Sequence, residues 1–393
     1  MLDAYVYDGA RTPFGRHAGS LARVRPDDLL AGTIKAIVGR SAFAPEDIED
    51  VVAGCANQAG EDSRNVARNA GLLAGLPVGA GGQTVNRLCG SGLAAVLDAA
   101  RAVSCGDGEL VVAGGVESMS RAPFVLGKSE APFSRAAAIF DSTMGARFPN
   151  PALLRRFGAD TMPETADNVA RDHGIDRASA DRFAEASQAK VRAARQFGFF
   201  RDEIIAVEVP GARGQPANRV EADEHPRPET TLDGLARLEP LFDGGVVTAG
   251  NASGINDGAA ALLVGSRKVG EKSGVRPRAR ILAGAVAGVE PRVMGLGPVP
   301  ASAKALARAG LTLKDVDVIE INEAFAAQVL GCLKLMGLAG DDGRVNPNGG
   351  AIAIGHPLGA SGARLALTAL RDLAGRGARY ALVAMCIGVG QGI

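Results

Sequence analysis

The chain has 393 residues, and its 43 basic residues (Lys and Arg) balance 43 acidic residues, so the formal net charge at pH 7 is +0. Hydrophobic residues make up 47% of the sequence, and 53 residues are glycine without any repeat of period three. These values exclude a strongly basic nucleic-acid binder, an acidic solvating chain and a collagen. They favour an α/β protein of two or three domains with many tight turns.

The N-terminal segment, residues 1–8, carries an acidic residue and no basic region, so it does not resemble a signal peptide. Apolar stretches such as residues 381–388 are shorter than the roughly 20 residues that span a bilayer. The five cysteines are scattered and form neither a disulfide framework nor a paired metal motif. We therefore expect a cytoplasmic protein in a reducing compartment, with no metal site, no membrane span and no nucleic-acid partner.

Two segments of the first half recur in the second half at nearly the same offset. Residues 47–57 resemble residues 315–325, an offset of 268 positions. Leu88–Gly92 precedes an Ala-rich helix and a strand at 110–113, and Leu358–Gly362 precedes a helix and a strand at 381–384, an offset of 270. Because the two offsets agree within two residues, we predict a duplicated α/β unit.

The segment between the halves, residues 120–248, is richer in charge and proline. It contains two helical patterns, one beginning near Pro163 with Thr161 as its cap and one over residues 183–197. We interpret it as a loop domain over the active site, between an N-terminal half (1–119 plus 249–272) and a C-terminal half (273–393). A strand at 260–264 closes the first half. The sequence stops where its counterpart in the second half should begin, so we expect either that the chain was trimmed or that the second unit has no final strand.

Cys89 stands at a predicted helix start, where the helix dipole and unpaired N–H groups favour a thiolate. A small buried hydrophobe is the alternative interpretation. Gly90, Gly92 and Ala95 also match the dinucleotide pattern G-x-G-x-x-A, but the preceding residues 85–88 are too polar for a convincing first strand.

Three further residues stand at strand ends or in turns. His356 lies in a glycine-bounded turn, which suits a functional base, although a helix-capping surface histidine fits equally. Cys386 follows a strand and precedes alternating glycines that can direct N–H groups at an oxyanion. Asn322 follows the strand at 316–321, where it can hold a water or carbonyl group, or cap a helix. Two thiols, an imidazole and an amide at strand ends suit acyl transfer, in which one thiol forms a thioester and the other moves protons.

These motifs resemble the signatures of the thiolase family. The resemblance rests on NRLCGSG (86–92), NEAFA (322–326), GHPLGASG (355–362) and CIGVGQG (386–392), and RTPFG (11–15) and TAGNASG (248–254) fit as well. It runs from Tyr5 to the last residue. It implies the thiolase fold, in which two similar α/β halves stack as five αβαβα layers beneath a loop domain, and a homo-oligomer, either a tetramer or a dimer.

The resemblance also implies a role for each matching residue. Cys89 is expected to be the acylated nucleophile, His356 its base, and Cys386 the group that exchanges a proton with the acetyl carbanion. Asn322, through a water, and His356 are expected to bind one thioester oxygen, and the N–H groups of Cys89 and Gly388 the other.

The remaining implied contacts concern the substrates. Ser253 and Arg227 match positions that contact coenzyme A, and Met162 matches a residue that lines the acyl pocket. Acyl-CoA and coenzyme A are substrates in this family, and no cofactor is needed.

Within the family, the sequence is similar to 3-oxoadipyl-CoA (β-ketoadipyl-CoA) thiolases at residues 141–148, at 162–166 and at Val389. Thr161-Met162-Pro163 stands where many acetoacetyl-CoA thiolases have His-Met-Gly. Because 3-oxoadipyl-CoA ends in a carboxylate, a cation near the acyl pocket would help, and we predict Arg147, with Arg135 second. A solvated loop arginine is the alternative for Arg147.

Other functions stay open from the sequence. An acetoacetyl-CoA thiolase or a broad 3-ketoacyl-CoA thiolase would use the same residues. A condensing enzyme of the ketoacyl-synthase type usually has a second histidine in place of Cys386, so the cysteine argues against it. A non-catalytic protein that binds CoA or a nucleotide would use the glycine turns alone.

Overall fold

In the computed structural model, which describes residues 1–211 and 214–393, the N-terminal half and one strand from the start of the C-terminal half build a seven-stranded mixed sheet. The strand order is β11-β1-β10-β5-β3-β4, and the short β2 pairs with β10. The bounds are β1 (Ala4–Arg11), β2 (Gly15–Arg16), β3 (Asp50–Gly54), β4 (Gln83–Val85), β5 (Leu110–Ser118), β10 (Asn256–Gly265) and β11 (Ala279–Ile281). β3, β4 and β5 are parallel, whereas β10 is antiparallel to both β5 and β1.

The central strands are apolar on both faces because helices cover both. Alternate residues of β10 pack into two different clusters: Leu263 lies in the cluster of α1 (Pro26–Arg40) and α2 (Val66–Leu73), and Leu262 in that of α3 (Ser91–Cys105) and α12 (Leu358–Arg376). This period-two alternation explains why the strand reads as a continuous run of alanine, leucine and valine.

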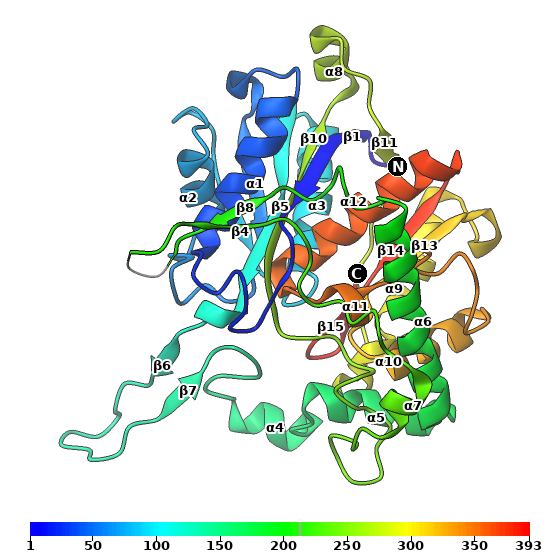
Figure 1. Cartoon of the computed structure of the whole chain (residues 1–393). Coiled ribbons are helices and arrows are strands. Elements are labelled where there is room, and N and C mark those ends of the chain that lie inside the picture. The colour runs from blue at the N-terminus through cyan, green and yellow to red at the C-terminus, as the bar shows by residue number, and fades with distance from the viewer. Residues whose placement is uncertain (212–213) are drawn as a thin grey trace.

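The second half of the chain forms a smaller set of strands behind α12. β13 (Val318–Ile321) and β14 (Ala381–Ala384) are parallel, and β12 (Ala287–Gly288), β16 (Gln391–Gly392) and β15 (Cys386–Ile387) form an antiparallel sheet. α12 contacts strands of both halves, and α9 (Pro298–Ala309) and α10 (Ala326–Met336) pack on the outer side. The order helix, sheet, helix, sheet, helix confirms the predicted five layers (Figure 1).

Strand register confirms the duplication. Val51 of β3 pairs with Val112 of β5, and Ile319 of β13 pairs with Leu382 of β14, both in parallel ladders. The two pairs are related by the offsets of 268 and 270 that the sequence shows. The two halves therefore repeat at the level of individual hydrogen-bonded pairs.

The end of the second half differs from the expectation that it lacks a final strand. β16 lies between β12 and β15, as β10 lies between β1 and β5, so the first residues of the matching strand are present. The chain turns back after Ile387 because Val389 and Gly390 adopt φ values of +65° and +84°. The value at Gly390 is favourable for glycine, whereas the value at Val389 is rare for a β-branched residue, so this three-residue turn places backbone strain directly after Gly388.

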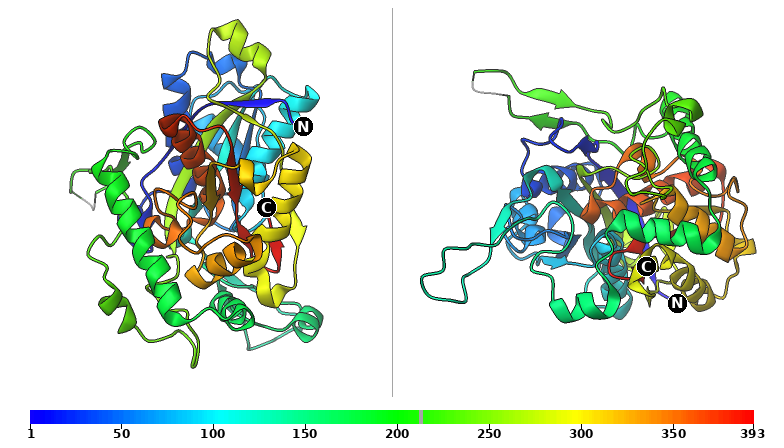
Figure 2. Two further views of the ribbon diagram at one scale, coloured as in Figure 1. Left: turned by 90° about the vertical axis from the view of Figure 1, so that its right-hand side faces the viewer. Right: turned by 90° about the horizontal axis from the view of Figure 1, so that it is seen from below.

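The middle segment leaves the layered core. It begins with β6 (Phe124–Leu126) and β7 (Ile139–Asp141), which form an arm that projects from the body (Figures 1 and 2). The two predicted helices are confirmed as α5 (Met162–His173), with a capping box from Thr161 and Glu164, and α6 (Arg177–Gln196). The other elements are α4 (Pro151–Phe157), β8 (Val207–Val209), β9 (Asn218–Val220) and α7 (Leu232–Ala236), with α8 (Arg267–Ser273) and α11 (Ala351–Ile354) in the two halves.

Within the described residues, one stretch, Leu88–Cys105, is long and apolar enough by composition to cross a membrane. It includes α3, and 61% of the stretch is buried in the fold, against β3, β5 and α12. Its apolar character is therefore accounted for by its place in the core.

The two halves meet backbone to backbone where α3 and α12 begin. A Cβ atom at Gly359 would lie 2.3 Å from the Val116 carbonyl oxygen and 2.5 Å from that of Gly54. A Cβ atom at Gly92 would lie 2.4 Å from the Gly359 carbonyl oxygen, and one at Gly362 would lie 2.2 Å from the Leu93 nitrogen. No side chain fits at these positions, so glycine is required for the helices to approach so closely.

Replacing Gly359 by alanine is therefore expected to destabilise the protein by at least about 1–3 kcal/mol, the usual cost of overpacking. Gly375→Ala is the matched control in the same helix, because a Cβ atom there meets nothing within 4 Å. Because alanine has a higher helix propensity than glycine, this control is expected to leave the free energy of unfolding unchanged or raise it by roughly 0.5–1 kcal/mol. Denaturant unfolding of both variants tests the expectation, which fails if they are equally stable.

Candidate active site

Cys89 lies in a tight turn between β4 and α3. The Ser91 hydroxyl accepts a hydrogen bond from the Arg87 N–H (2.8 Å) and donates one to the Leu88 carbonyl (2.6 Å), and Leu88 adopts a φ of +49°. β4 ends at Val85, so the polar residues 86–88 belong to the turn and not to a strand, as their polarity predicts. This strand–turn–helix arrangement presents the thiol at the end of a strand.

Burial dominates the ionisation of the Cys89 thiol. It raises the pKa to about 11, and the backbone N–H groups of Gly388 and Cys89 itself lower it only in part. The helix start was expected to favour the thiolate, but the loss of solvation outweighs that effect here. The resting group is a neutral thiol, and its attack on a carbonyl requires a base.

His356 is held in one tautomer by Ser361. Its Nδ1 lies 2.6 Å from the Ser361 hydroxyl, which itself donates to the Pro357 carbonyl at 2.8 Å. Since the hydroxyl proton is used on Pro357, the oxygen accepts from Nδ1–H, and Nε2 carries the free lone pair. Burial, with a smaller effect of the Arg364 charge, lowers the His356 pKa to about 3, so the ring is neutral and able to accept a proton.

Asn322 faces the free nitrogen of this histidine. Its Nδ2 lies 3.4 Å from His356 Nε2, and its own N–H donates to the Ala384 carbonyl at the end of β14. The Asn322 Oδ1 is buried and has no hydrogen-bond partner among the described residues. The amide is thus placed to hold a polar group of a substrate or a water beside the imidazole.

The second thiol and the glycine turn complete the site. Cys386 is buried, and burial, together with the nearby Cys89 and Cys332, raises its pKa well above the ordinary value. The Gly388 backbone lies beside Leu88 and Met162, since a Cβ atom there would be 3.4 Å from Leu88 Cδ1 and 3.6 Å from Met162 Sδ. Met162 is 37% exposed, so it lies where the site opens to solvent.

The remaining predicted residues, which are assigned to substrate binding, differ in their contacts and in their exposure. Ser253 donates its N–H to the Ala324 carbonyl (2.9 Å), two residues after Asn322. Arg227 is exposed, and its N–H donates to Gln188 Oε1. Arg147 is partly buried and donates to Asn57 Oδ1 (3.2 Å), whereas Arg135 is exposed on the connection between β6 and β7. No contact among the described residues joins Arg227, Arg147 or Arg135 to Cys89 or His356, so their roles stay predictions.

Sequence reasoning missed the residues that hold the catalytic turn. Asn256 at the start of β10 accepts the His356 N–H through Oδ1 (2.9 Å) and donates to the Gly15 carbonyl through Nδ2 (2.9 Å). Ser361 has a local signal, because a hydroxyl on the first helical turn after His356 can reach back to the ring. Asn256 has none, since it lies 100 residues away in the chain.

Within residues 1–211 and 214–393, no three His, Cys, Asp or Glu side chains gather to form a metal site. The group described above is instead that of covalent acyl transfer: a thiol, a neutral imidazole, a second thiol and backbone N–H groups.

Comparison with known proteins agrees with this geometry. Family models for "Thiolase, N-terminal domain" and "Thiolase, C-terminal domain" match residues 4–268 and 275–393. The chain belongs to the thiolase family.

Among similar thiolases, the 3-oxoadipyl-CoA/3-oxo-5,6-dehydrosuberyl-CoA thiolase of Escherichia coli K12 is 57% identical, over 100% of this chain and 98% of the relative. A 3-ketoacyl-CoA thiolase of Vibrio cholerae is 46% identical, over 100% of this chain and 98% of its own. The crystal structure of human mitochondrial 3-ketoacyl-CoA thiolase in complex with CoA superposes with a TM-score of 0.91 at 38% identity, over 100% of this chain and 96% of that one.

Ser361→Ala is expected to lower kcat for thiolysis on the order of 10- to 100-fold, because the imidazole loses the partner that fixes its tautomer. KM is expected to change little, since Ser361 is buried beneath the ring. The control is Ser302→Ala, which removes a buried hydroxyl that has no partner among the described residues. Steady-state kinetics of both variants test this role, and equal kcat values would contradict it.

Proposed function

We propose that this thiolase cleaves 3-oxoadipyl-CoA with coenzyme A to give succinyl-CoA and acetyl-CoA, or catalyses the reverse condensation. The observation that carries the proposal is the higher sequence identity to a relative named for 3-oxoadipyl-CoA than to a relative named for 3-ketoacyl-CoA. The chain is 57% identical to a thiolase named for 3-oxoadipyl-CoA and 46% identical to one named for 3-ketoacyl-CoA, over 98% of each relative.

In the proposed first step, Cys89 Sγ attacks the 3-keto carbon while His356 Nε2 takes the thiol proton. The bond between C2 and C3 then breaks, which leaves the succinyl group on Cys89 as a thioester and acetyl-CoA as an enolate. Burial lowers the His356 pKa to about 3, so the ring is neutral and its free Nε2 lone pair can accept the thiol proton. The N–H groups of Cys89 and Gly388 lie beside the sulfur and can stabilise the developing oxyanion.

In the second step, the enolate carbon takes a proton from Cys386, and acetyl-CoA leaves. The raised pKa of Cys386 keeps this thiol protonated at neutral pH, as a proton donor must be. Coenzyme A then attacks the Cys89 thioester while its thiol proton passes to the Cys386 thiolate, and the departing Cys89 sulfur takes back the proton held by His356 as succinyl-CoA leaves. In the condensation direction, the Cys386 thiol in its deprotonated form removes a methyl proton from acetyl-CoA.

The terminal carboxylate of 3-oxoadipyl-CoA distinguishes it from neutral substrates, and Arg147 is our candidate for its partner. Arg147 contacts Asn57, and the neighbouring Ala56 carbonyl accepts a hydrogen bond from Asn86 of the segment before Cys89. These contacts support a place for Arg147 near the acyl end of the site. Its current partner is a neutral amide, so its charge is available to an anionic ligand.

Thiolysis rates are expected to be higher for 3-oxoadipyl-CoA than for 3-oxohexanoyl-CoA, which has the same chain length without the carboxylate, and for acetoacetyl-CoA. A binding contact to a carboxylate predicts a preference in kcat/KM on the order of 10-fold or more over 3-oxohexanoyl-CoA. Equal values for the two six-carbon substrates would overturn the proposed specificity. Mass spectrometry of a Cys89 acyl adduct, absent in Cys89→Ser, tests the covalent step separately.

Arg147→Ala is expected to reduce the preference for 3-oxoadipyl-CoA over acetoacetyl-CoA roughly 10-fold while acetoacetyl-CoA cleavage stays within about twofold of wild type. Arg135→Ala, which removes an exposed arginine of the same segment, serves as the control. If Arg147→Ala leaves the preference unchanged, the substrate carboxylate is bound elsewhere.

The arm formed by β6 and β7 supports the expectation that the chain is a homo-oligomer. It carries exposed apolar side chains far from the core, among them Phe124, Phe133 and Ile139. Large apolar groups on a projecting element are typical of association surfaces. A second copy of the chain is the partner we propose for this arm.

A further inference from the structure

Glu117 is a buried carboxylate to which the acyl-transfer steps assign no role. It lies near the end of β5, is 2% exposed, and pairs with Gly258 of β10 in the sheet. Its two oxygens accept three backbone hydrogen bonds. Oε1 accepts from the Asn57 N–H (2.9 Å), and Oε2 accepts from the N–H groups of Ala56 (3.0 Å) and Gly359 (2.9 Å).

These three donors come from both halves of the protein. Ala56 and Asn57 follow β3 in the N-terminal half, whereas Gly359 lies in the first turn of α12 in the C-terminal half. That turn also contains Ser361, the partner of the His356 ring, and it begins directly after the His356–Pro357 turn. One carboxylate therefore connects the helix that orients the base to the half that carries the nucleophile.

Few side-chain contacts hold the first turn of α12 at Gly359, so its position depends on hydrogen bonds such as the one to Glu117. Gly359 contacts the backbone of β3 and β5 with no side chain of its own, so no interlocking of side chains fixes the position of this residue. Hydrogen bonds to a charged acceptor are about twice as strong as those between neutral groups. The Glu117 carboxylate supplies such a bond at the point where the two halves touch.

We propose that Glu117 is a positioning residue of the thiolase reaction: it holds the first turn of α12, and with it Ser361 and His356, in register with Cys89. This inference rests on the proposed acyl-transfer chemistry but not on the identity of the acyl chain. A displacement of about 1 Å between reacting groups can lower a rate on the order of 100-fold, so loss of this contact should be visible in kcat.

The charge of Glu117 provides an independent observable. The titratable groups that face it are Cys55, whose Sγ lies 3.9 Å from Oε1, Asp62, and Cys89, whose pKa its charge raises. Burial raises the Glu117 pKa to about 7, against the effect of the three N–H donors, so the group is largely ionised at pH 8. Removing the charge should therefore lower the Cys89 pKa and speed the reaction of this thiol with an alkylating reagent at pH 8.

The test compares Glu117→Gln with wild type in turnover and in Cys89 alkylation. Glutamine keeps the size of the side chain but places an NH2 group against backbone donors, so kcat is expected to fall on the order of 10- to 100-fold, with KM for coenzyme A within about twofold. At pH 8, alkylation of Cys89 by iodoacetamide, located by mass spectrometry, is expected to be roughly two- to tenfold faster. A variant that only loosens the fold would also speed alkylation of the buried Cys332, so unchanged alkylation of Cys332 identifies the faster reaction of Cys89 as an effect of the lost charge.

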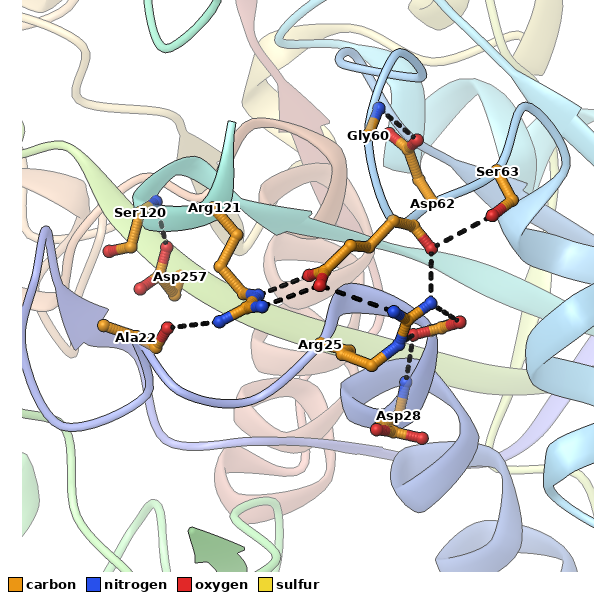
Figure 3. A network of polar contacts seen from close by, with 11 residues as sticks. Ala22, Arg25, Asp28, Gly60, Asp62, Ser63, Ser120, Arg121 and Asp257 are labelled. Carbon is orange, nitrogen blue, oxygen red and sulfur yellow. Dashed lines mark hydrogen bonds and ion pairs between the residues drawn. The ribbon is translucent and has the colours of Figure 1, made fainter. Parts of the chain in front are cut away.

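Glu61→Gln is the matched control, because it removes a carboxylate from the same segment without touching Glu117. Glu61 forms ion pairs with Arg121 and Arg25, which are partly exposed and belong to the polar network of Figure 3. Its variant is expected to retain wild-type kcat and wild-type alkylation of Cys89.

Glu117→Asp covers the case in which the glutamine variant does not fold. Aspartate keeps the charge but is too short for all three donors, so kcat should fall at least about fivefold while the pH profile of alkylation stays that of wild type. Unchanged kcat in either variant, or a loss of kcat equal to the loss of alkylatable Cys89, would overturn the proposal. Turnover is measured with whichever 3-oxoacyl-CoA is cleaved fastest, so a failure of the 3-oxoadipyl-CoA assignment leaves this test intact.

Discussion

The backbone contact between the starts of α3 and α12 determines where the reactive groups of this thiolase lie. Gly92 and Gly359 allow these helices to approach closer than any side chain would permit. Cys89 precedes one helix and His356 precedes the other, so the contact brings the proposed nucleophile and the proposed base from opposite halves to one place. The layers of helices and strands around the contact keep the two helix starts from moving apart, since each helix is buried against strands along its length.

Burial at this contact sets the chemistry as well as the geometry. A solvated cysteine beside a solvated histidine could exchange a proton at rest, but here the pKa of Cys89 rises to about 11 and that of His356 falls to about 3. Both groups are neutral until a substrate supplies a developing oxyanion near the N–H groups of Cys89 and Gly388. The proton transfer is therefore coupled to attack on the carbonyl, where those donors stabilise charge.

The sequence could nominate the candidate reactive residues because each stands in a local motif. Cys89, Asn322, His356 and Cys386 all follow strands or precede helices, and the offset between the halves predicts the fold. Their ionisation could not be predicted, because the helix start favours a thiolate and only the three-dimensional packing shows how strongly burial opposes it. The supporting contacts of Asn256 and Glu117 were equally hidden, since each joins residues that lie 100 or more positions apart.

The duplication also explains why the described residues contain one such group of candidate reactive side chains and not two. Position 89 corresponds to position 359 under the offset of 270, and position 54 corresponds to position 322 under the offset of 268. Where one half has a reactive side chain, Cys89 or Asn322, the other has a glycine, Gly359 or Gly54. Those glycines are the residues through which the halves touch, since a Cβ atom at Gly54 would lie 2.4 Å from the Gly92 nitrogen. A second thiol at position 359 would force the helices apart, so the close contact that creates the one site excludes the other.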